Sequence, residues 1–262
     1  MKKTSSILVA ALLLCLPAGA QGAAGKHSFV TEYSVEYLGI RVAKSTFSST
    51  ISSDAFEVHG SIKSSGLARF FDSTEGTTYA AGNFAGETTR PRGYVVAYTY
   101  GEKAKKTHLA FKSDSVAAVT NTPDLPSRHA HWVKVSAKDL KAVVDPLSAA
   151  LVKADTPAAV CGRTVRVFDG EFRADIVLSA SKASPARVPG TEAGAVVCSA
   201  RLVPVAGYYP TNKSLGYLRD KSRVDITFAQ LGGTGIYAPV HASVGTRFGP
   251  VTIRTRSLKA SN

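Results

Sequence analysis

The two cysteines Cys161 and Cys198 have the most definite chemistry in this sequence. They stand 37 positions apart, so they do not form the C-x-x-C pair of a thiol–disulfide oxidoreductase. No histidine pattern beside them would complete a tetrahedral zinc site. Two cysteines in a protein exported to an oxidising compartment usually join, and in the chain-entropy model such a bond stabilises the fold by about 4 kcal/mol. The sequence therefore predicts a structural disulfide between Cys161 and Cys198.

Histidines and carboxylates offer few arrangements for catalysis or metal binding. His129 and His131 would project from one face of an extended segment, but the sequence supplies no third metal ligand. Four acidic residues could pair across strands as acid and base, although isolated carboxylates are more typical of solvated strand faces: Asp54, Glu57, Asp72 and Glu75. The chain contains no G-x-S-x-G, P-loop or H-E-x-x-H motif. We therefore expect a protein that is not an enzyme and that holds no metal and no cofactor.

The first residues predict a secretory signal peptide. Lys2 and Lys3 supply its positive charge, and the apolar run 7–16 is about half as long as a membrane-spanning helix. Small residues then offer a cleavage site after Ala20, with a second after Ala24. We expect residues 1–20 to be removed on export to the periplasm, together with Cys15, and residues 21–262 to form a single all-β domain.

A strong positive charge characterises the chain. It has 32 Lys and Arg against 19 Asp and Glu, a net charge of +13 that falls to about +11 without Lys2 and Lys3. Such a surplus favours anionic partners in the envelope, namely lipid head groups, lipopolysaccharide or cell-wall polymers. The alternative is that scattered cations serve solubility. Because the chain is exported, we expect no nucleic-acid partner.

Most of the mature chain alternates apolar and polar residues with period two. In the segment 29–37, for example, Phe29, Tyr33 and Val35 share one face while Glu32 and Ser34 take the other. Similar segments, bounded by Gly, Ser, Asp, Asn and Pro, recur at spacings of about 10 to 15 residues. The pattern predicts roughly a dozen antiparallel strands in a sandwich, a barrel or a wound sheet.

Two local signals refine this prediction. Asp169-Gly170 between two apolar segments predicts a hairpin with a type I′ turn, because both residues tolerate positive φ. Asp145 followed by Pro146 predicts a capped helix that continues through apolar residues to Val152. We expect this one short, buried helix to fill the concave side of a curved sheet.

Four segments resemble an uncharacterised family of Gram-negative envelope proteins. They are YSVEYLGI at 33–40, DPLS at 145–148, VFDG at 167–170 and PVAG at 204–207, the last following Cys198. Members of this family are similar in architecture to periplasmic lipoprotein carriers and envelope-integrity proteins. The resemblance implies an antiparallel open or spiral β-barrel, and it carries over no active-site residue.

Three functional classes remain open at this point. We favour a non-enzymatic protein of cell-envelope maintenance that binds an apolar or anionic ligand, or an envelope protein partner, on a concave β surface. The alternatives are a hydrolase or transferase acting on cell-wall or lipid substrates, and an outer-membrane β-barrel. The residues expected to contact a ligand lie on the helix and at a tyrosine pair: Leu147, Leu151, Tyr208 and Tyr209.

Overall fold

The computed structural model describes residues 25–66, 73–188, 191 and 194–261. The predicted signal peptide therefore lies outside the described residues. Fourteen strands form one antiparallel sheet, in the order β7-β6-β5-β4-β3-β2-β1-β14-β13-β12-β11-β10-β9, with β8 paired to β13. The sheet is not closed, because β7 and β9 end the path. The prediction of an all-β antiparallel, open fold is confirmed, with fourteen strands where the sequence predicted about a dozen.

The strands are β1 (His27–Tyr37), β2 (Ile40–Ile51), β3 (Ala55–Ser64), β4 (Glu75–Ala85), β5 (Thr88–Tyr100), β6 (Lys103–Lys112), β7 (Ser115–Thr122), β8 (Val152–Lys153), β9 (Arg163–Phe168), β10 (Arg173–Ala180), β11 (Val196–Ala206), β12 (Val224–Gln230), β13 (Ile236–Thr246) and β14 (Gly249–Ser261). The helical segments are η2 (Ala137–Leu140), α1 (Pro146–Ala149), η3 (Pro157–Val160) and α2 (Lys213–Asp220). No helix in the described part of the chain is long and apolar enough to cross a membrane.

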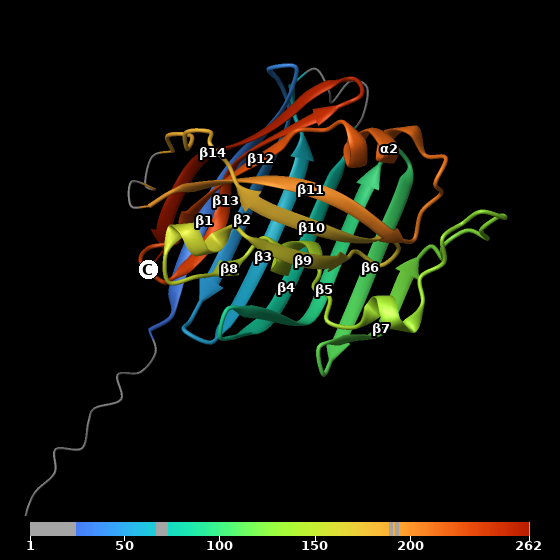
Figure 1. Cartoon of the computed structure of the whole chain (residues 1–262), viewed down its shortest axis with the longest axis horizontal. Helices are drawn as coiled ribbons and strands as arrows, with labels where there is room; N and C mark the ends of the chain where they lie inside the picture. The colour runs from blue at the N-terminus through green and yellow to red at the C-terminus, as the bar shows by residue number, and fades with distance from the viewer. Residues whose placement is uncertain (1–24, 67–72, 189–190, 192–193, 262) are drawn as a thin grey trace, which may run out of the picture.

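The sheet winds back over itself, so that β8 to β12 cross in front of β2 to β6 (Figure 1). Inward-facing side chains from both layers form the main core, because alternate residues of a strand point to the same face. Phe29, Ile51, Phe56 and Leu109 come from β1, β2, β3 and β6, while Phe168 comes from β9, Ile236 from β13, and Val143 and Leu151 from the segments on either side of α1. Hydrophobic burial between the layers thus holds the winding in place.

The two open edges are joined by the segment 141–144. Lys141 makes an antiparallel bridge to Ser115 at the start of β7, and Val144 makes a parallel bridge to Val167 on β9. The Val144 N–H donates to the Arg166 carbonyl at 2.8 Å, and the Phe168 N–H donates to the Val144 carbonyl at 2.9 Å. This segment satisfies backbone groups of an edge strand that would otherwise be free to pair with another chain.

Two predictions about helices need correction. α1 ends at Ala149, with Ala150 as its C-cap, and the chain then extends into β8 at Val152 instead of remaining helical. A second helix, α2, was not predicted. Its N-cap Asn212 accepts hydrogen bonds from the Ser214 and Leu215 N–H groups at 3.1 and 3.0 Å, and it packs against β11 and β13.

The hairpin at Asp169-Gly170 exists, but its predicted type I′ turn is wrong. Phe168 pairs with Arg173, so four residues, 169–172, connect β9 to β10. Gly170 has a φ of 109°, whereas Asp169 does not have a positive φ. The Asp169 carboxylate accepts hydrogen bonds from the Glu171 and Phe172 N–H groups at 2.9 and 2.7 Å, and these bonds close a wider turn.

Candidate functional site

An apolar cavity of about 430 Å³ lies on the concave face of the sheet. Its volume is within the range of about 300–1,000 Å³ typical of small-molecule sites. None of the described residues that line it carries a charge. Aliphatic and aromatic side chains dominate the lining: Tyr33, Val35, Phe47, Val58, Ile62, Val96, Tyr98, Leu147, Leu151, Leu231, Pro239 and Ile253. The surface is therefore suited to an apolar ligand.

Helix α1 forms one wall of this cavity and is held by a buried cap. Asp145 is fully buried, and its carboxylate accepts hydrogen bonds from the Leu147 and Ser148 N–H groups at 3.0 and 2.9 Å. The Ser148 hydroxyl donates to it at 2.5 Å. Pro146 occupies the first turn, where a missing N–H leaves nothing unpaired. The cap thereby fixes Leu147 and Leu151, the two residues of this segment that the sequence predicts to contact a ligand, against the cavity.

Two hydroxyl groups on the cavity wall, those of Tyr33 and Thr78, are hydrogen-bonded to backbone carbonyls. The Tyr33 hydroxyl donates to the Pro239 carbonyl at 2.7 Å, and its ring meets Phe47 edge-on with centroids 5.7 Å apart. Burial raises the pKa of Tyr33 to about 12. The Thr78 hydroxyl likewise donates to the Val95 carbonyl at 3.0 Å. Because these donors are engaged, Tyr33 and Thr78 keep the lining effectively apolar and uncharged.

The cavity reaches solvent on the side of the β1–β2 turn. Ile62, which lines it, is 40% exposed. Ile62 pairs with Ser45 on β2, and Val35 pairs with Ile253 on β14. Tyr37 lies two residues after Val35 on the same face of β1 and is the last residue before the β1–β2 turn. A ligand entering here would pass the ends of β1, β2 and β14.

Two other cavities adjoin α1. One of about 270 Å³ lies on the opposite side, is lined by inward residues of β9 to β12, and shares Ala150 and Pro239 with the larger cavity. The other, of about 280 Å³, lies where β5 approaches β9. Four of its five ionisable residues pair with each other, Arg163 with Glu87 and Arg90 with Asp114, both at 3.3 Å, and the fifth is Arg166. The 430 Å³ cavity is therefore the best candidate site for an apolar ligand.

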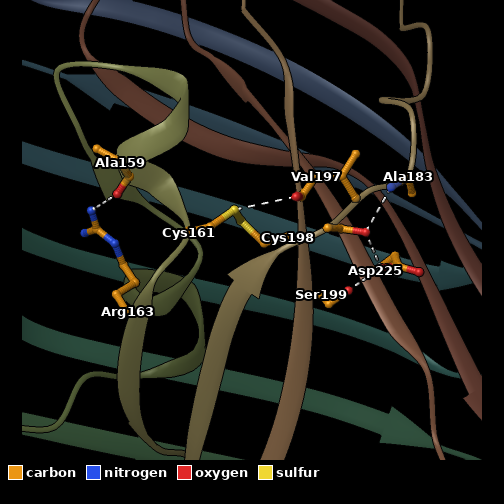
Figure 2. Close-up of a disulfide and its surroundings, with 9 residues drawn as sticks. Ala159, Cys161, Arg163, Ala183, Val197, Cys198, Ser199 and Asp225 are labelled. Atoms are coloured by element: carbon orange, nitrogen blue, oxygen red, sulfur yellow. Dashed lines mark hydrogen bonds between the residues drawn. A yellow bond between two sulfur atoms is a disulfide. The ribbon is translucent and has the colours of Figure 1, made fainter.

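The predicted disulfide is confirmed and lies behind the front layer. It joins Cys161, which follows η3, to Cys198 on β11, with the two Cα atoms 5.6 Å apart (Figure 2). Both cysteines pack in a second apolar cluster with Val160 and Tyr237. The bond ties the connection between α1 and β9 to β11 in the front layer.

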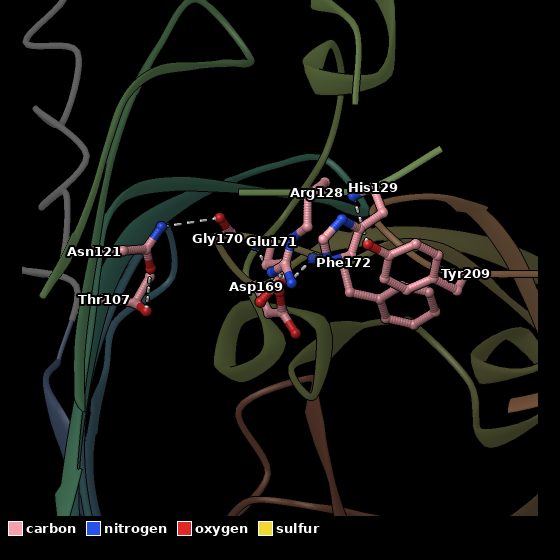
Figure 3. A network of polar contacts seen from close by, with 9 residues as sticks. All are labelled: Thr107, Asn121, Arg128, His129, Asp169, Gly170, Glu171, Phe172 and Tyr209. Atoms are coloured by element: carbon pink, nitrogen blue, oxygen red, sulfur yellow. Dashed lines mark hydrogen bonds and ion pairs between the residues drawn. The ribbon is translucent and has the colours of Figure 1, made fainter. Parts of the chain in front are cut away.

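Tyr208 and Tyr209, predicted to contact a ligand, lie away from the cavity. The Tyr209 hydroxyl accepts a hydrogen bond from the His129 N–H at 3.0 Å (Figure 3). The Tyr209 ring also meets the Trp132 ring, with centroids 4.7 Å apart. Tyr208 bridges to Val133 through its backbone. Both tyrosines therefore hold the loop that follows β7 against the end of β11, and sequence alone did not show this packing partner.

Ionisable groups do not gather at the cavity. His59 and Glu57 contact each other on the other face of β3, Asp54 lies in the β2–β3 turn, and Glu75 pairs with Lys63. Asp72 is outside the described residues. His129 and His131 are exposed. Within the part of the chain that the structure describes, no group of three or more His, Cys, Asp or Glu residues is arranged to hold a metal ion.

Residues missed by sequence reasoning make up most of the cavity. Tyr33, Val35 and Phe47 on β1 and β2, and Pro239 and Ile253 on β13 and β14, come together only when the sheet winds. Their alternation showed which face each would share. The sequence did not indicate where on the concave face of the sheet the side chains would leave a cavity.

The fold and the site together define an open, wound antiparallel β-sheet protein with an apolar interior cavity. The chain belongs to the DUF3108 family of proteins of unknown function, whose family model matches residues 32–256. The matched region includes every described residue that lines the cavity except Thr31. The predicted membership of an uncharacterised family is confirmed.

One solved structure is similar in outline. A β-barrel-like protein of the DUF1849 domain of unknown function from Brucella abortus aligns with a TM-score of 0.48 and 8% sequence identity, covering 90% of this chain and 98% of that one. Among curated proteins, no sequence matches this chain.

Proposed function

We propose that this protein binds an apolar ligand, of the acyl-chain type found in envelope lipids, in the 430 Å³ cavity, and that it does so in the periplasm as a non-enzymatic component of cell-envelope maintenance. The observation that carries the proposal is the lining of that cavity. It consists mainly of aliphatic and aromatic side chains, holds no charged residue among those described, and includes two hydroxyl groups, of Tyr33 and Thr78, that already donate to backbone carbonyls. Such a lining favours apolar surface through the hydrophobic effect and offers no charged partner to a polar solute.

Two further features support an exported protein that meets lipid. The Cys161–Cys198 disulfide is typical of oxidising compartments such as the periplasm. The net charge of +13 favours anionic envelope components, including lipid head groups, lipopolysaccharide and cell-wall polymers. The protein can also bind an envelope protein partner, because the charged side chains outside the cavity can contact that partner while a ligand occupies the cavity.

The alternative functions have less support. A hydrolase or transferase needs ionisable groups beside its substrate. Among the described residues that line the cavity, the ionisable groups are the hydroxyls of Tyr33 and Tyr98, and burial raises the pKa of Tyr33 to about 12. An outer-membrane barrel needs a closed sheet with an apolar outer band. Here the sheet path is open, and the outward face of β3 carries Glu57 and Lys63.

Native mass spectrometry of the mature protein purified from the periplasm, combined with lipid extraction, tests the proposal. We expect a stoichiometric apolar ligand with at least one acyl chain. An apoprotein that remains unliganded after incubation with envelope extract would contradict the proposal and favour a protein-interaction role.

A further inference from the structure

Two adjacent hairpin turns present exposed apolar side chains at one end of the molecule. Leu38 in the β1–β2 turn is 56% exposed, its neighbour Ile40 is 61% exposed, and Phe248 in the β13–β14 turn is 69% exposed. They are the three most exposed large hydrophobic residues in the described part of the chain. Figure 1 shows both turns together at the top of the view. We call Leu38, Ile40 and Phe248 the apolar tip.

The two turns are joined to each other, so the tip is a fixed surface. The Leu38 N–H donates to the Pro250 carbonyl at 3.1 Å, and the Tyr37 hydroxyl donates to the Phe248 carbonyl at 2.5 Å. Leu38 also packs over Gly249, where an added Cβ would lie 2.5 Å from a Leu38 methyl carbon. The side chains are therefore presented by paired strands rather than by independent loops.

Leu38 occupies a position that folding does not explain. Leu38 and Gly39 are the two central residues of the turn and have φ values of 51° and 81°. A turn with positive φ at both positions favours Asn or Gly, and a bulky side chain there is strained. A large apolar residue that is both strained and exposed points to a role in contact with something outside the molecule.

Cationic side chains lie beside the apolar tip and along the strands that lead to it. Arg41 follows Ile40, and the Arg247 guanidinium lies 5.3 Å from the centre of the Phe248 ring. On the neighbouring strands, Arg254 and Arg256 are each about half exposed and share one carboxylate, Glu36. Within residues 36–44 and 247–256 there are thus five cations and one anion: Arg41, Lys44, Arg247, Arg254 and Arg256, against Glu36.

We infer that the apolar tip docks this protein on an anionic phospholipid surface, with Leu38, Ile40 and Phe248 inserted among the acyl chains and the nearby arginines at the head groups. Apolar insertion together with attraction between cations and anionic lipids is the combination that holds peripheral proteins at membranes. The cavity opens toward the same end of β1 and β14. Docking does not require a ligand in the cavity, so this inference goes beyond the proposed function.

Sedimentation with vesicles tests the inference directly. The mature protein should bind phosphatidylcholine vesicles that contain phosphatidylglycerol, bind vesicles of phosphatidylcholine alone more weakly, and be released by salt. Phe248→Ser should weaken partitioning about tenfold or more, since burying such a side chain accounts for that factor. Arg247→Gln should weaken it about fivefold on the anionic vesicles.

Leu38→Asn separates docking from folding, because Asn suits positive φ in this turn. We expect this variant to melt no lower than the wild type and to bind the anionic vesicles several-fold more weakly. The matched control is Leu125→Asn, which removes an exposed leucine from the loop after β7 and should bind like the wild type. Ala238→Leu, which narrows the cavity, should also bind vesicles normally.

Three results would overturn the inference. They are a wild-type protein that binds neither vesicle, tip variants that bind as well as the wild type, and a loss of binding in Leu125→Asn equal to that in Leu38→Asn. Normal vesicle binding by a protein that never takes an apolar ligand would leave the docking surface supported and contradict only the proposed function.

Discussion

The Cys161–Cys198 disulfide closes a long loop in the front layer, and its loss should act on folding. With 37 positions between the cysteines, the bond stabilises the fold by about 4 kcal/mol through the entropy of the unfolded chain. We expect Cys161→Ala/Cys198→Ala to lower the free energy of urea unfolding by about that amount, and dithiothreitol to destabilise the wild type similarly. A double variant as stable as the wild type would contradict a structural role.

Asp145 is the residue whose ionisation should register in stability. Burial outweighs its hydrogen bonds to Ser148 and Leu147 and raises its pKa above 3.8. Between 3.8 and the raised value, the folded state holds a proton that the unfolded state has lost, so this residue's contribution to stability falls as pH rises. The cost of burying the charge is absent below 3.8 and complete above the folded pKa.

Asp145→Asn tests that assignment, because Asn also caps helices but does not titrate. As pH rises through the acid range above 3.8, the free energy of unfolding of the wild type should fall relative to that of the variant. Urea unfolding of both proteins at several pH values measures the difference. A difference that is constant, or that moves in favour of the wild type with rising pH, would show that the carboxylate is stabilised instead.

Among the elements, the segment 141–144 matters most for the shape of the sheet, because it bonds to the edges at β7 and β9. Val144→Pro removes the N–H that donates to the Arg166 carbonyl at 2.8 Å. We expect a loss of about 1–3 kcal/mol in unfolding free energy and faster amide hydrogen exchange at Phe168. Val144→Ala is the matched control, since it keeps both backbone bonds. Equal stability and exchange in the two variants would mean that this segment does not hold the edge.

Elements with local causes were the ones that sequence could predict. Asp145 and Pro146 start α1 through contacts within four consecutive residues, since Asp145 caps the N–H groups of Leu147 and Ser148. Such a local signal can be seen in the sequence. The end of α1 was not predictable in the same way, since Val152 leaves the helix to pair with Tyr237 on β13. The Asp169 turn was mistaken because a carboxylate can close a longer loop than the Asp-Gly pair suggests. For α2, the local signal in the sequence is Asn212, a residue type that favours the N-cap position.

At the scale of the whole molecule, the winding of the sheet creates the site. Leu147 and Leu151 could be assigned to the concave side from a buried helix in an all-β chain. The companions of those leucines, such as Tyr33 and Phe47, lie a hundred or more positions away in sequence and meet them only through the strand order. Local alternation of apolar and polar residues predicts which side chains point inward. The size of the cavity between those side chains depends on the distance between the two layers of the sheet.

The most direct test of the central claim is a titration of the mature protein with a fluorescent fatty acid, comparing Ala238→Leu with Ala118→Leu. Ala238 lines the cavity, so a leucine there should occupy its volume, while Ala118 is exposed on the edge strand β7. We expect saturable binding in the wild type and in Ala118→Leu, and binding weakened about tenfold or more in a folded Ala238→Leu. Equal binding by all three proteins, or no binding by the wild type, would contradict an apolar ligand site in this cavity.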